Sequence, residues 1–557
     1  MKIAGYKNIF LLSACSLSFI LGGFVVQKVD EEKLTVAMVH QAEKLIGINF
    51  TDAEADSMLA NLEDQRKDYA ELRKLNIANS VSPALNFNPV PVGYKFPDAA
   101  NSFKIAELKN VKLPADRNEL AYYSIGELAA LLKSRQITSV ELTRFFIDRL
   151  KQYNGSLYNV VTFTEDHAMK SAAQADAEIR AGKYRGLLHG IPYGVKDLLV
   201  VDGFKTTFGA TPYKDQFLTG TATVVDRLNA AGAVLIAKTT LGALAMGDVW
   251  YGGKTRNPWN VKRGSSGSSA GSASAVAAGC MPFAIGSETL GSIVSPSTEC
   301  GTTGLRPTFG RISKYGAMSL SWSMDKLGPI TRNVEDLAIV FEAIRGADGK
   351  DLSVIPAPFS YSSPAKSLKG FKIGYLKADF ERRYSNRGND SLTLARLKAL
   401  GAQLVPIELP KLPYSSMTLA LSAEAAAAFD ELTLTNRDDE LVKQDKNAWP
   451  NYFRSARFIP AVEYIQANRA RTLLIEQLNQ KLKGLDLYIS PSFSSNLTAT
   501  NLSGHPCVVL PNGFNKEGLP TSITFMGQLF GEGKLLQAAQ VYQSVTDFHK
   551  KHPTLNF

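Results

Sequence analysis

Residues 263–279 read Arg-Gly-Ser-Ser-Gly-Ser-Ser-Ala-Gly-Ser-Ala-Ser-Ala-Val-Ala-Ala-Gly, a stretch built almost entirely of glycine, serine and alanine. Taken alone, this composition is also typical of a flexible linker. Here, however, the Ser/Gly turns run directly into residues 273–278, which suit a tightly packed helix. A Gly-rich turn that enters a helix presents unpaired backbone N–H groups, which favour negative charge. No lysine follows the glycines, so the pattern argues against a nucleotide-binding loop.

A lysine upstream and a second small-residue loop downstream complete the pattern. Residues 194–197 read Gly-Val-Lys-Asp, and Lys196 follows an apolar run that we expect to be buried. Residues 288–293 read Glu-Thr-Leu-Gly-Ser-Ile, a loop whose consecutive N–H groups can surround Ser292. A serine hydroxyl needs a base to act as a nucleophile, and a lysine kept neutral by desolvation can be that base. The pattern favours a serine hydrolase in which lysine replaces histidine.

The composition excludes several other classes. The chain has 557 residues, of which 45% are hydrophobic and 20% charged, an ordinary globular balance. Its net charge of +10 is not gathered into a dense basic block, so we expect no nucleic-acid partner. The four cysteines and six histidines lack metal-ligand spacing, so we expect no metal and no cofactor. The cysteines of the body, Cys280, Cys300 and Cys507, are interpreted as buried thiols.

The N-terminus has the pattern of a targeting segment. Lys2 and Lys7 precede an uncharged, mainly apolar run over residues 9–26, and charged residues follow from Lys28. This order predicts a signal peptide or signal anchor over residues 1–29, with membrane anchoring through residues 9–26 as one alternative. Two further alternatives for this segment are lipidation at Cys15 and a buried N-terminal helix in a cytosolic protein. The prediction places the protein outside the cytoplasm, in a bacterial periplasm or on a membrane, with a cytoplasmic location as the alternative.

The remaining chain is predicted to contain a helical N-terminal extension and linker, residues 30–116, and a catalytic domain, residues 117–557. Capping boxes begin at Thr51, Ser124 and Thr138. Alternating helical and strand patterns indicate an α/β fold, with a mixed, largely parallel-containing central sheet covered by helices on both faces. Expected helices include residues 168–181, 223–231, 334–345, 390–400 and 423–434, and expected strands include residues 159–164, 193–201, 233–237, 372–375, 402–405, 485–490 and 507–510.

The motifs also carry a family resemblance. The chain resembles the amidase signature family, in which the glutaminase subunits of glutamyl-tRNA(Gln) amidotransferase are related members. The resemblance extends over about residues 121–542 and is most specific in its middle third. It rests on residues 190–197, 257–260, 264–272, 286–293, 301–308 and 325–329, which occur in the family's order.

The resemblance implies a Ser–cis-Ser–Lys triad and an amidase signature fold. By position, Ser292 is the nucleophile, Ser268 is the bridging serine on a cis peptide bond, and Lys196 is the base. The substrate is then a small-molecule amide, cleaved through an acyl-enzyme intermediate. The oxyanion hole implied by the resemblance consists of the backbone N–H groups of Thr289, Leu290, Gly291 and Ser292.

The chain departs from the family at the second loop. Members commonly have Asp, Gly and Arg where this chain has Glu288, Leu290 and Val294. We therefore expect the acid–arginine pair that often steadies the loop to lack its arginine, and we expect a leucine side chain near the oxyanion hole. Neither change removes a member of the triad.

Three functions compete at this point. The first is an amidase that hydrolyses a linear carboxamide C–N bond. The alternative is the glutaminase (A) subunit of a tRNA-dependent amidotransferase, which needs a partner complex. The third is a non-catalytic scaffold, which the intact Lys196, Ser268 and Ser292 argue against. The oligomeric state is left open, with a homodimer among the alternatives.

Overall fold

The computed structural model describes residues 33–74, 78–81, 85–97, 100–106, 108, 110–363 and 365–557. The predicted signal peptide or anchor, residues 1–29, lies outside the described residues. Among the helices that are described, none is long and apolar enough to span a bilayer. The chain divides into two compact units, Met1–Asn76 and Ile77–Phe557.

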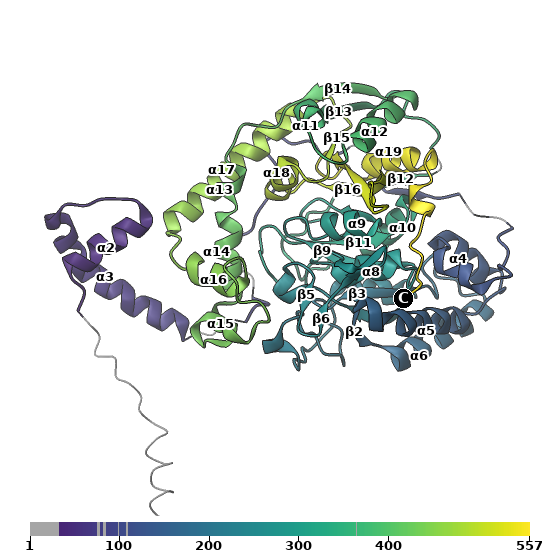
Figure 1. Ribbon diagram of the computed structural model, residues 1–557, viewed down its shortest axis with the longest axis horizontal. Helices are drawn as coiled ribbons and strands as arrows, with labels where there is room; N and C mark the ends of the chain where they lie inside the picture. Colours follow the sequence, from purple (N-terminus) through teal and green to yellow (C-terminus); the bar gives the residue numbers. More distant parts are fainter. Residues whose placement is uncertain are drawn as a thin grey trace, which may run out of the picture. The chain divides into compact units, whose positions relative to one another are not determined.

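The N-terminal unit contains a pair of helices, drawn in purple in Figure 1. Helix α2 (Val36–Ile46) ends at Gly47, whose left-handed φ of 71° suits a residue without a side chain. Helix α3 (Asp52–Arg73) begins with the predicted capping box: the Glu54 N–H donates to Thr51 Oγ1, and the Thr51 N–H donates to Glu54 Oε2 at 2.7 Å. The helical character predicted for this extension is confirmed.

The predicted linker is built into the second unit. The Asn79 side chain donates to the Ser319 carbonyl at 2.8 Å and accepts from the Ser319 N–H at 2.8 Å. Strand β1 (Ser102–Lys104) pairs in parallel with β12 (Ser360–Ser362). The two compact units divide after Asn76, and the extended segment contributes the Asn79 contacts and strand β1 to the second unit.

An eleven-stranded mixed sheet runs through the described part of the second unit. Parallel pairs join β13 to β14 and β15, and β3 to β4 and β9, whereas the strands between these groups pair antiparallel. The predicted mixed sheet is confirmed. In spatial order its strands are β14 (Gln403–Ile407), β13 (Lys372–Leu376), β15 (Leu487–Pro491), β17 (Pro520–Gly527), β16 (Cys507–Phe514), β10 (Thr303–Arg306), β11 (Lys326–Thr331), β9 (Phe283–Glu288), β3 (Pro192–Lys196), β4 (Val234–Thr239) and β2 (Val160–Phe163).

Helices pack on this sheet in groups (Figure 1). One group contains α8 and α9, and another contains α10, α7 and α19. The predicted cap residues of α4 and α5, Ser124 and Thr138, form both bonds of a capping box. The α-helices are α4 (Ile125–Lys133), α5 (Ser139–Leu157), α6 (Glu165–Arg180), α7 (Thr223–Ala230), α8 (Ala270–Ala277), α9 (Val294–Cys300), α10 (Val334–Ile344), α11 (Lys377–Glu381), α12 (Arg387–Ala399), α13 (Tyr414–Met417), α14 (Leu419–Ala428), α15 (Asp430–Leu434), α16 (Trp449–Ala456), α17 (Ala461–Lys481), α18 (Ser495–Ser503) and α19 (Glu532–Ser544).

Two predicted elements have different bounds in the structure. The helix expected over residues 423–434 is two helices, because the backbone leaves the helical region at Phe429 (φ −125°, ψ 29°). The strand expected over residues 193–201 ends at Lys196, where a turn begins. The three body cysteines are buried free thiols, as predicted.

Candidate active site

Lys196 is the last residue of β3, between the parallel strands β4 and β9. Carboxyl ends of parallel strands meet at one edge of a sheet, which is where α/β proteins commonly bind ligands. The Lys196 side chain is fully buried. Strand β3 therefore places the Lys196 amine at the carboxyl end of the parallel strands, where it is buried from water.

Three serine hydroxyls surround the Lys196 amine. As an ammonium group its Nζ donates to Ser268 Oγ at 2.7 Å, to Ser287 Oγ at 2.9 Å and to Ser269 Oγ at 3.3 Å. Burial lowers the pKa of Lys196 to about 7, although the charges of Asp325 and Glu288 oppose this shift. Near neutral pH a substantial fraction of this lysine is therefore uncharged.

The serine-rich stretch forms an ordered loop followed by α8, as predicted. The Gly267–Ser268 peptide bond is cis, as the resemblance implied. A Cβ at Gly267 would lie 1.9 Å from the carbonyl oxygen of Gly247, so the backbone approaches too closely for a side chain. Helix α8 is buried along its whole length. The loop is thus fixed by packing, which excludes the linker interpretation.

The second predicted loop lies between β9 and α9. The backbone N–H groups of Thr289, Leu290, Gly291 and Ser292 have no acceptor within the described residues. Gly291 has φ 88°, a value suited to glycine. The four predicted oxyanion-hole donors are therefore consecutive N–H groups available to an external acceptor.

Ser292 lies on this loop, and the loop is tied to the serine-rich stretch. The Ser269 N–H donates to the Ser292 carbonyl at 3.1 Å. The Ser292 residue is 9% exposed, and in the described part of the chain its hydroxyl makes no hydrogen bond. The structure thus brings Lys196 and Ser268 into direct contact and connects the Ser292 backbone to the residue after Ser268.

A buried ion pair corrects one expectation from the sequence. Glu288 does have an arginine partner: Arg306 Nη1, from β10, donates to Glu288 Oε1 at 2.7 Å. Asn501 Nδ2 donates to the same oxygen at 2.8 Å. Burial alone would raise the pKa of Glu288, but Arg306 and the hydrogen bonds to Val294 and Asn501 hold it at about 2. Arg306 of β10 therefore takes the place of the arginine that is absent at position 294.

A small cavity adjoins the end of β9 and the start of the second loop. Ser287, which contacts Lys196, and Thr289, the first residue of the second loop, both line it. Thr289 Oγ1 also donates to the buried Asp325 at 2.5 Å. Most of the lining is apolar. The lining residues are Leu198, Ala245, Ser287, Thr289, Lys314, Ala317, Met318, Ser319, Leu320, Trp322, Asp325 and Leu327.

A second buried ion pair supports the end of β3. Lys238 Nζ lies 2.8 Å from Asp197 Oδ1, and both side chains are fully buried. The Thr207 N–H and hydroxyl both donate to the other Asp197 oxygen. The residue after Lys196 is therefore anchored to β4.

Histidine takes no part in this arrangement. His189 accepts from the Arg185 N–H at 3.1 Å and lies 3.3 Å from Glu178. His505 is buried beside Ser503. Neither contacts Ser268 or Ser292, so the lysine-based site is the arrangement that the described residues support.

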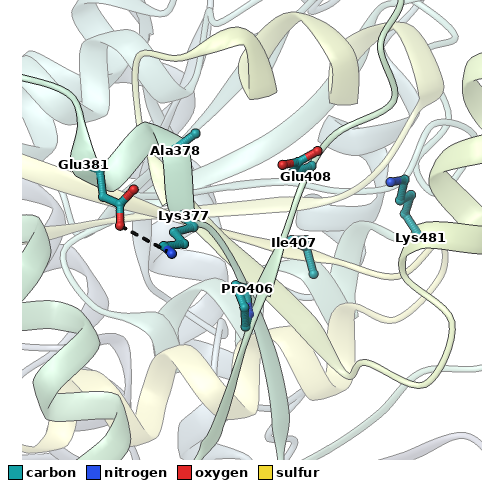
Figure 2. A pocket seen from close by; sticks show the side chains of 7 residues that line it. All are labelled: Lys377, Ala378, Glu381, Pro406, Ile407, Glu408 and Lys481. Carbon is teal, nitrogen blue, oxygen red and sulfur yellow. Dashed lines mark ion pairs between the residues drawn. The ribbon is translucent and has the colours of Figure 1, made fainter.

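A separate surface depression lies at the opposite end of the sheet (Figure 2). It is lined by residues of α11, β14 and α17, including the ion pair between Lys377 and Glu381 at 3.8 Å. It contains no serine, cysteine or histidine among the described residues that line it. Its described lining contains lysines but offers no hydroxyl or thiol nucleophile, which the hydrolase chemistry requires.

Comparison with known proteins identifies the family of the chain. The family model described as Amidase matches residues 141–499, more than half of the chain. The A subunit of glutamyl-tRNA(Gln) amidotransferase from Coxiella burnetii is 32% identical over 481 residues, which cover 78% of this chain and 99% of the relative. The corresponding protein from Moorella thermoacetica is 33% identical, and the match covers 78% of this chain and 99% of that protein.

Solved structures have the same fold. The native peptide amidase from Stenotrophomonas maltophilia superposes with a TM-score of 0.70 at 29% identity, covering 78% of this chain and 99% of that one. A bacterial aryl acylamidase superposes with a TM-score of 0.69 at 22% identity, and the superposition covers 78% of this chain and 100% of that one. At this identity the similarity supports the fold alone. The fold and the family match define an amide hydrolase of the α/β class. The chain belongs to the amidase signature family.

Proposed function

We propose that Lys196, Ser268 and Ser292 form the catalytic triad of this amidase. The observation that carries the proposal is the 2.7 Å contact between the buried Lys196 amine and Ser268. A neutral amine has two N–H donors and one lone pair. Ser269 Oγ donates to the Ser287 carbonyl, so toward the amine it can only accept. Donation by the amine to Ser269 and Ser287 leaves its lone pair for the Ser268 hydroxyl.

The proposed reaction then proceeds as a proton relay. Ser268 passes its proton to Lys196 and takes the proton of Ser292, whose oxygen attacks the amide carbonyl. The C–N bond breaks when Ser268 delivers a proton to the leaving nitrogen, and an acyl ester on Ser292 remains. Lys196 returns its proton to Ser268, so the amine is neutral again. Water then attacks the ester while Ser268 takes its proton and passes its own to Lys196, and return of a proton to the Ser292 oxygen releases the acid.

The free N–H groups of residues 289–292 support an oxyanion hole in this scheme. Negative charge develops on the carbonyl oxygen when the tetrahedral intermediate forms, and preorganised N–H donors stabilise it. Their position next to Ser292 in the chain supports the proposal that nucleophile and donors converge on one carbonyl.

We propose that the substrate is a linear carboxamide with a compact, mainly apolar group. The cavity beside Ser287 and Thr289 supports this, since leucine, alanine, methionine and tryptophan side chains provide most of its wall. A hydrolysis series of aliphatic amides of increasing length and branching tests this assignment. Turnover should be greatest for short acyl groups; equal turnover of long and bulky amides would contradict it.

The test of the triad uses three substitutions and two measurements of folding. Lys196→Met, Ser268→Ala and Ser292→Ala should each lower amide kcat by several orders of magnitude, while the melting temperature and circular dichroism stay close to wild type. Near-normal turnover in any of the three variants would remove that residue from the mechanism.

The similarity to the glutaminase subunits of amidotransferases supports a second candidate, a glutaminase that works within a complex. The two are separated by assaying the isolated chain. An amidase should hydrolyse simple amides alone, whereas a glutaminase that belongs to a complex should require partner proteins and prefer glutamine.

We also propose that the enzyme acts outside the cytoplasm. The basic residues Lys2 and Lys7 and the apolar run over residues 9–26 support this. A fusion of residues 1–35 to a reporter that is active only after export should be active. An inactive fusion that is nevertheless stably expressed would favour the cytoplasmic alternative.

A further inference from the structure

One carboxylate links the two ends of the proposed oxyanion loop. Glu288 is the residue before the loop, and its Oε2 accepts from the N–H groups of Ile293 at 2.8 Å and Val294 at 2.9 Å, just after the loop. The loop between these positions, residues 289–292, carries the unpaired N–H groups and Ser292. The side chain of Glu288 therefore sets the separation of the two ends of the loop.

The other oxygen of Glu288 is fixed from two distant elements. Arg306 Nη1 donates to it at 2.7 Å from β10, and Asn501 Nδ2 donates to it at 2.8 Å from α18. Arg306 Nη2 donates in turn to Thr500 Oγ1 and to the His505 carbonyl, each at 3.0 Å. The loop is thus connected through one carboxylate to a strand, a helix and a turn.

Stability alone gives a poor account of this arrangement. A buried ion pair often contributes little net free energy, because desolvation offsets the attraction between the charges. The same chain contains another buried pair, Arg311 and Glu532 at 3.2 Å, whose carboxylate contacts Thr308 rather than the loop. The feature peculiar to Glu288 is its position across the loop that bears the nucleophile.

We infer that Glu288 and Arg306 are positioning residues that hold the N–H groups of residues 289–292 in the geometry that stabilises the oxyanion. The inference rests on the proposed function. Arg306 reaches the carboxylate from β10 and supplies the cation that the loop itself lacks at Val294. Neither residue touches substrate in this assignment; both act through the backbone of the loop.

The test measures covalent labelling of Ser292 by a fluorophosphonate, because negative charge develops on the phosphoryl oxygen during attack. The variants are Glu288→Gln, Arg306→Lys and Arg306→Met, with Glu532→Gln as the matched control. A glutamine amide has one acceptor oxygen where the carboxylate has two. It therefore cannot accept both from the N–H groups of Ile293 and Val294 and from the side chains of Arg306 and Asn501. The maximal labelling rate, the reagent's half-saturating concentration and the melting temperature are recorded for each protein.

We expect Glu288→Gln and Arg306→Met to lower the maximal labelling rate on the order of 100-fold, with half-saturation within about twofold of wild type. Arg306→Lys should recover part of the rate, since it keeps the charge. Glu532→Gln should lose melting temperature and keep its labelling rate.

Three results would overturn the inference. They are wild-type labelling rates in folded Glu288→Gln, equal rates for the Lys and Met variants at Arg306, and a rate loss in Glu532→Gln as large as that in Glu288→Gln. If Arg306→Met does not fold, the isosteric Glu288→Gln variant still decides the question. Absence of Ser292 labelling in the wild type would instead refute the proposed function.

Discussion

The pH dependence of amide hydrolysis is the most quantitative consequence of the site. Burial lowers the pKa of Lys196 to about 7, and only the neutral amine can accept the proton of Ser268. The active form therefore predominates above this pKa and is lost as the pH falls through it. With a pKa near 7, the neutral fraction is about 9% at pH 6, about 50% at pH 7 and about 91% at pH 8. The rate should rise about tenfold between pH 6 and pH 8.

The assay is kcat/KM for one amide between pH 5 and pH 9.5, in buffers of constant ionic strength. A second perturbation tests the origin of the pKa. The charge of Asp325 raises the pKa of Lys196, so Asp325→Asn should move the midpoint of the profile to lower pH. Glu532 is a buried carboxylate that does not contribute to the pKa of Lys196. The Glu532→Gln variant should therefore leave the midpoint of the pH profile unchanged.

Two outcomes would refute this reasoning. A profile that is flat from pH 5 to pH 9, with chemistry shown to be rate-limiting by a solvent isotope effect, would exclude a titrating lysine base. A midpoint that moves to higher pH in Asp325→Asn would show that the field at the amine has the opposite sign.

Three further substitutions test the supports of the site. Gly267→Ala should abolish activity and lower soluble yield, since its Cβ would lie 1.9 Å from the Gly247 carbonyl oxygen; an active, well-folded variant would contradict this packing. Lys238→Met should lower the free energy of unfolding by about 3–5 kcal/mol, because Asp197 then stays buried without a cation; urea denaturation measures it, and no change would show that the pair is dispensable. Ser287→Ala should lower kcat about tenfold with an unchanged melting temperature, since one typical hydrogen bond to the buried amine is lost; unchanged kcat would exclude this serine from orienting the amine.

The local parts of the site were predictable from the sequence because each lies within one short motif. The serine-rich loop, the loop around Ser292 and the lysine at a strand end are all local patterns, and the structure contains each of them. The contact between Lys196 and Ser268 joins residues 72 positions apart, and the family resemblance anticipated it. Ser287 was part of a quoted motif, but its contact with the amine depends on the pairing of β3 with β9.

The error at Glu288 shows where local reasoning fails. The missing arginine was sought within the loop, whereas Arg306 comes from β10 and Asn501 from α18, residues that only the tertiary fold brings to the carboxylate. A signal existed in Arg306, which lies within the quoted motif 301–308. The order of the strands and the antiparallel centre of the sheet likewise depend on long-range pairing. Periodicity along the chain does not encode such pairings.

The central claim is that the Ser292 oxygen is the nucleophile and the Lys196 amine is its base. Mass spectrometry of the protein after reaction with a fluorophosphonate, followed by peptide mapping, tests it most directly. We expect a single adduct on Ser292 in the wild type and a rate of adduct formation lowered by orders of magnitude in folded Lys196→Met. An adduct on another residue, or equal labelling of the two proteins, would contradict it.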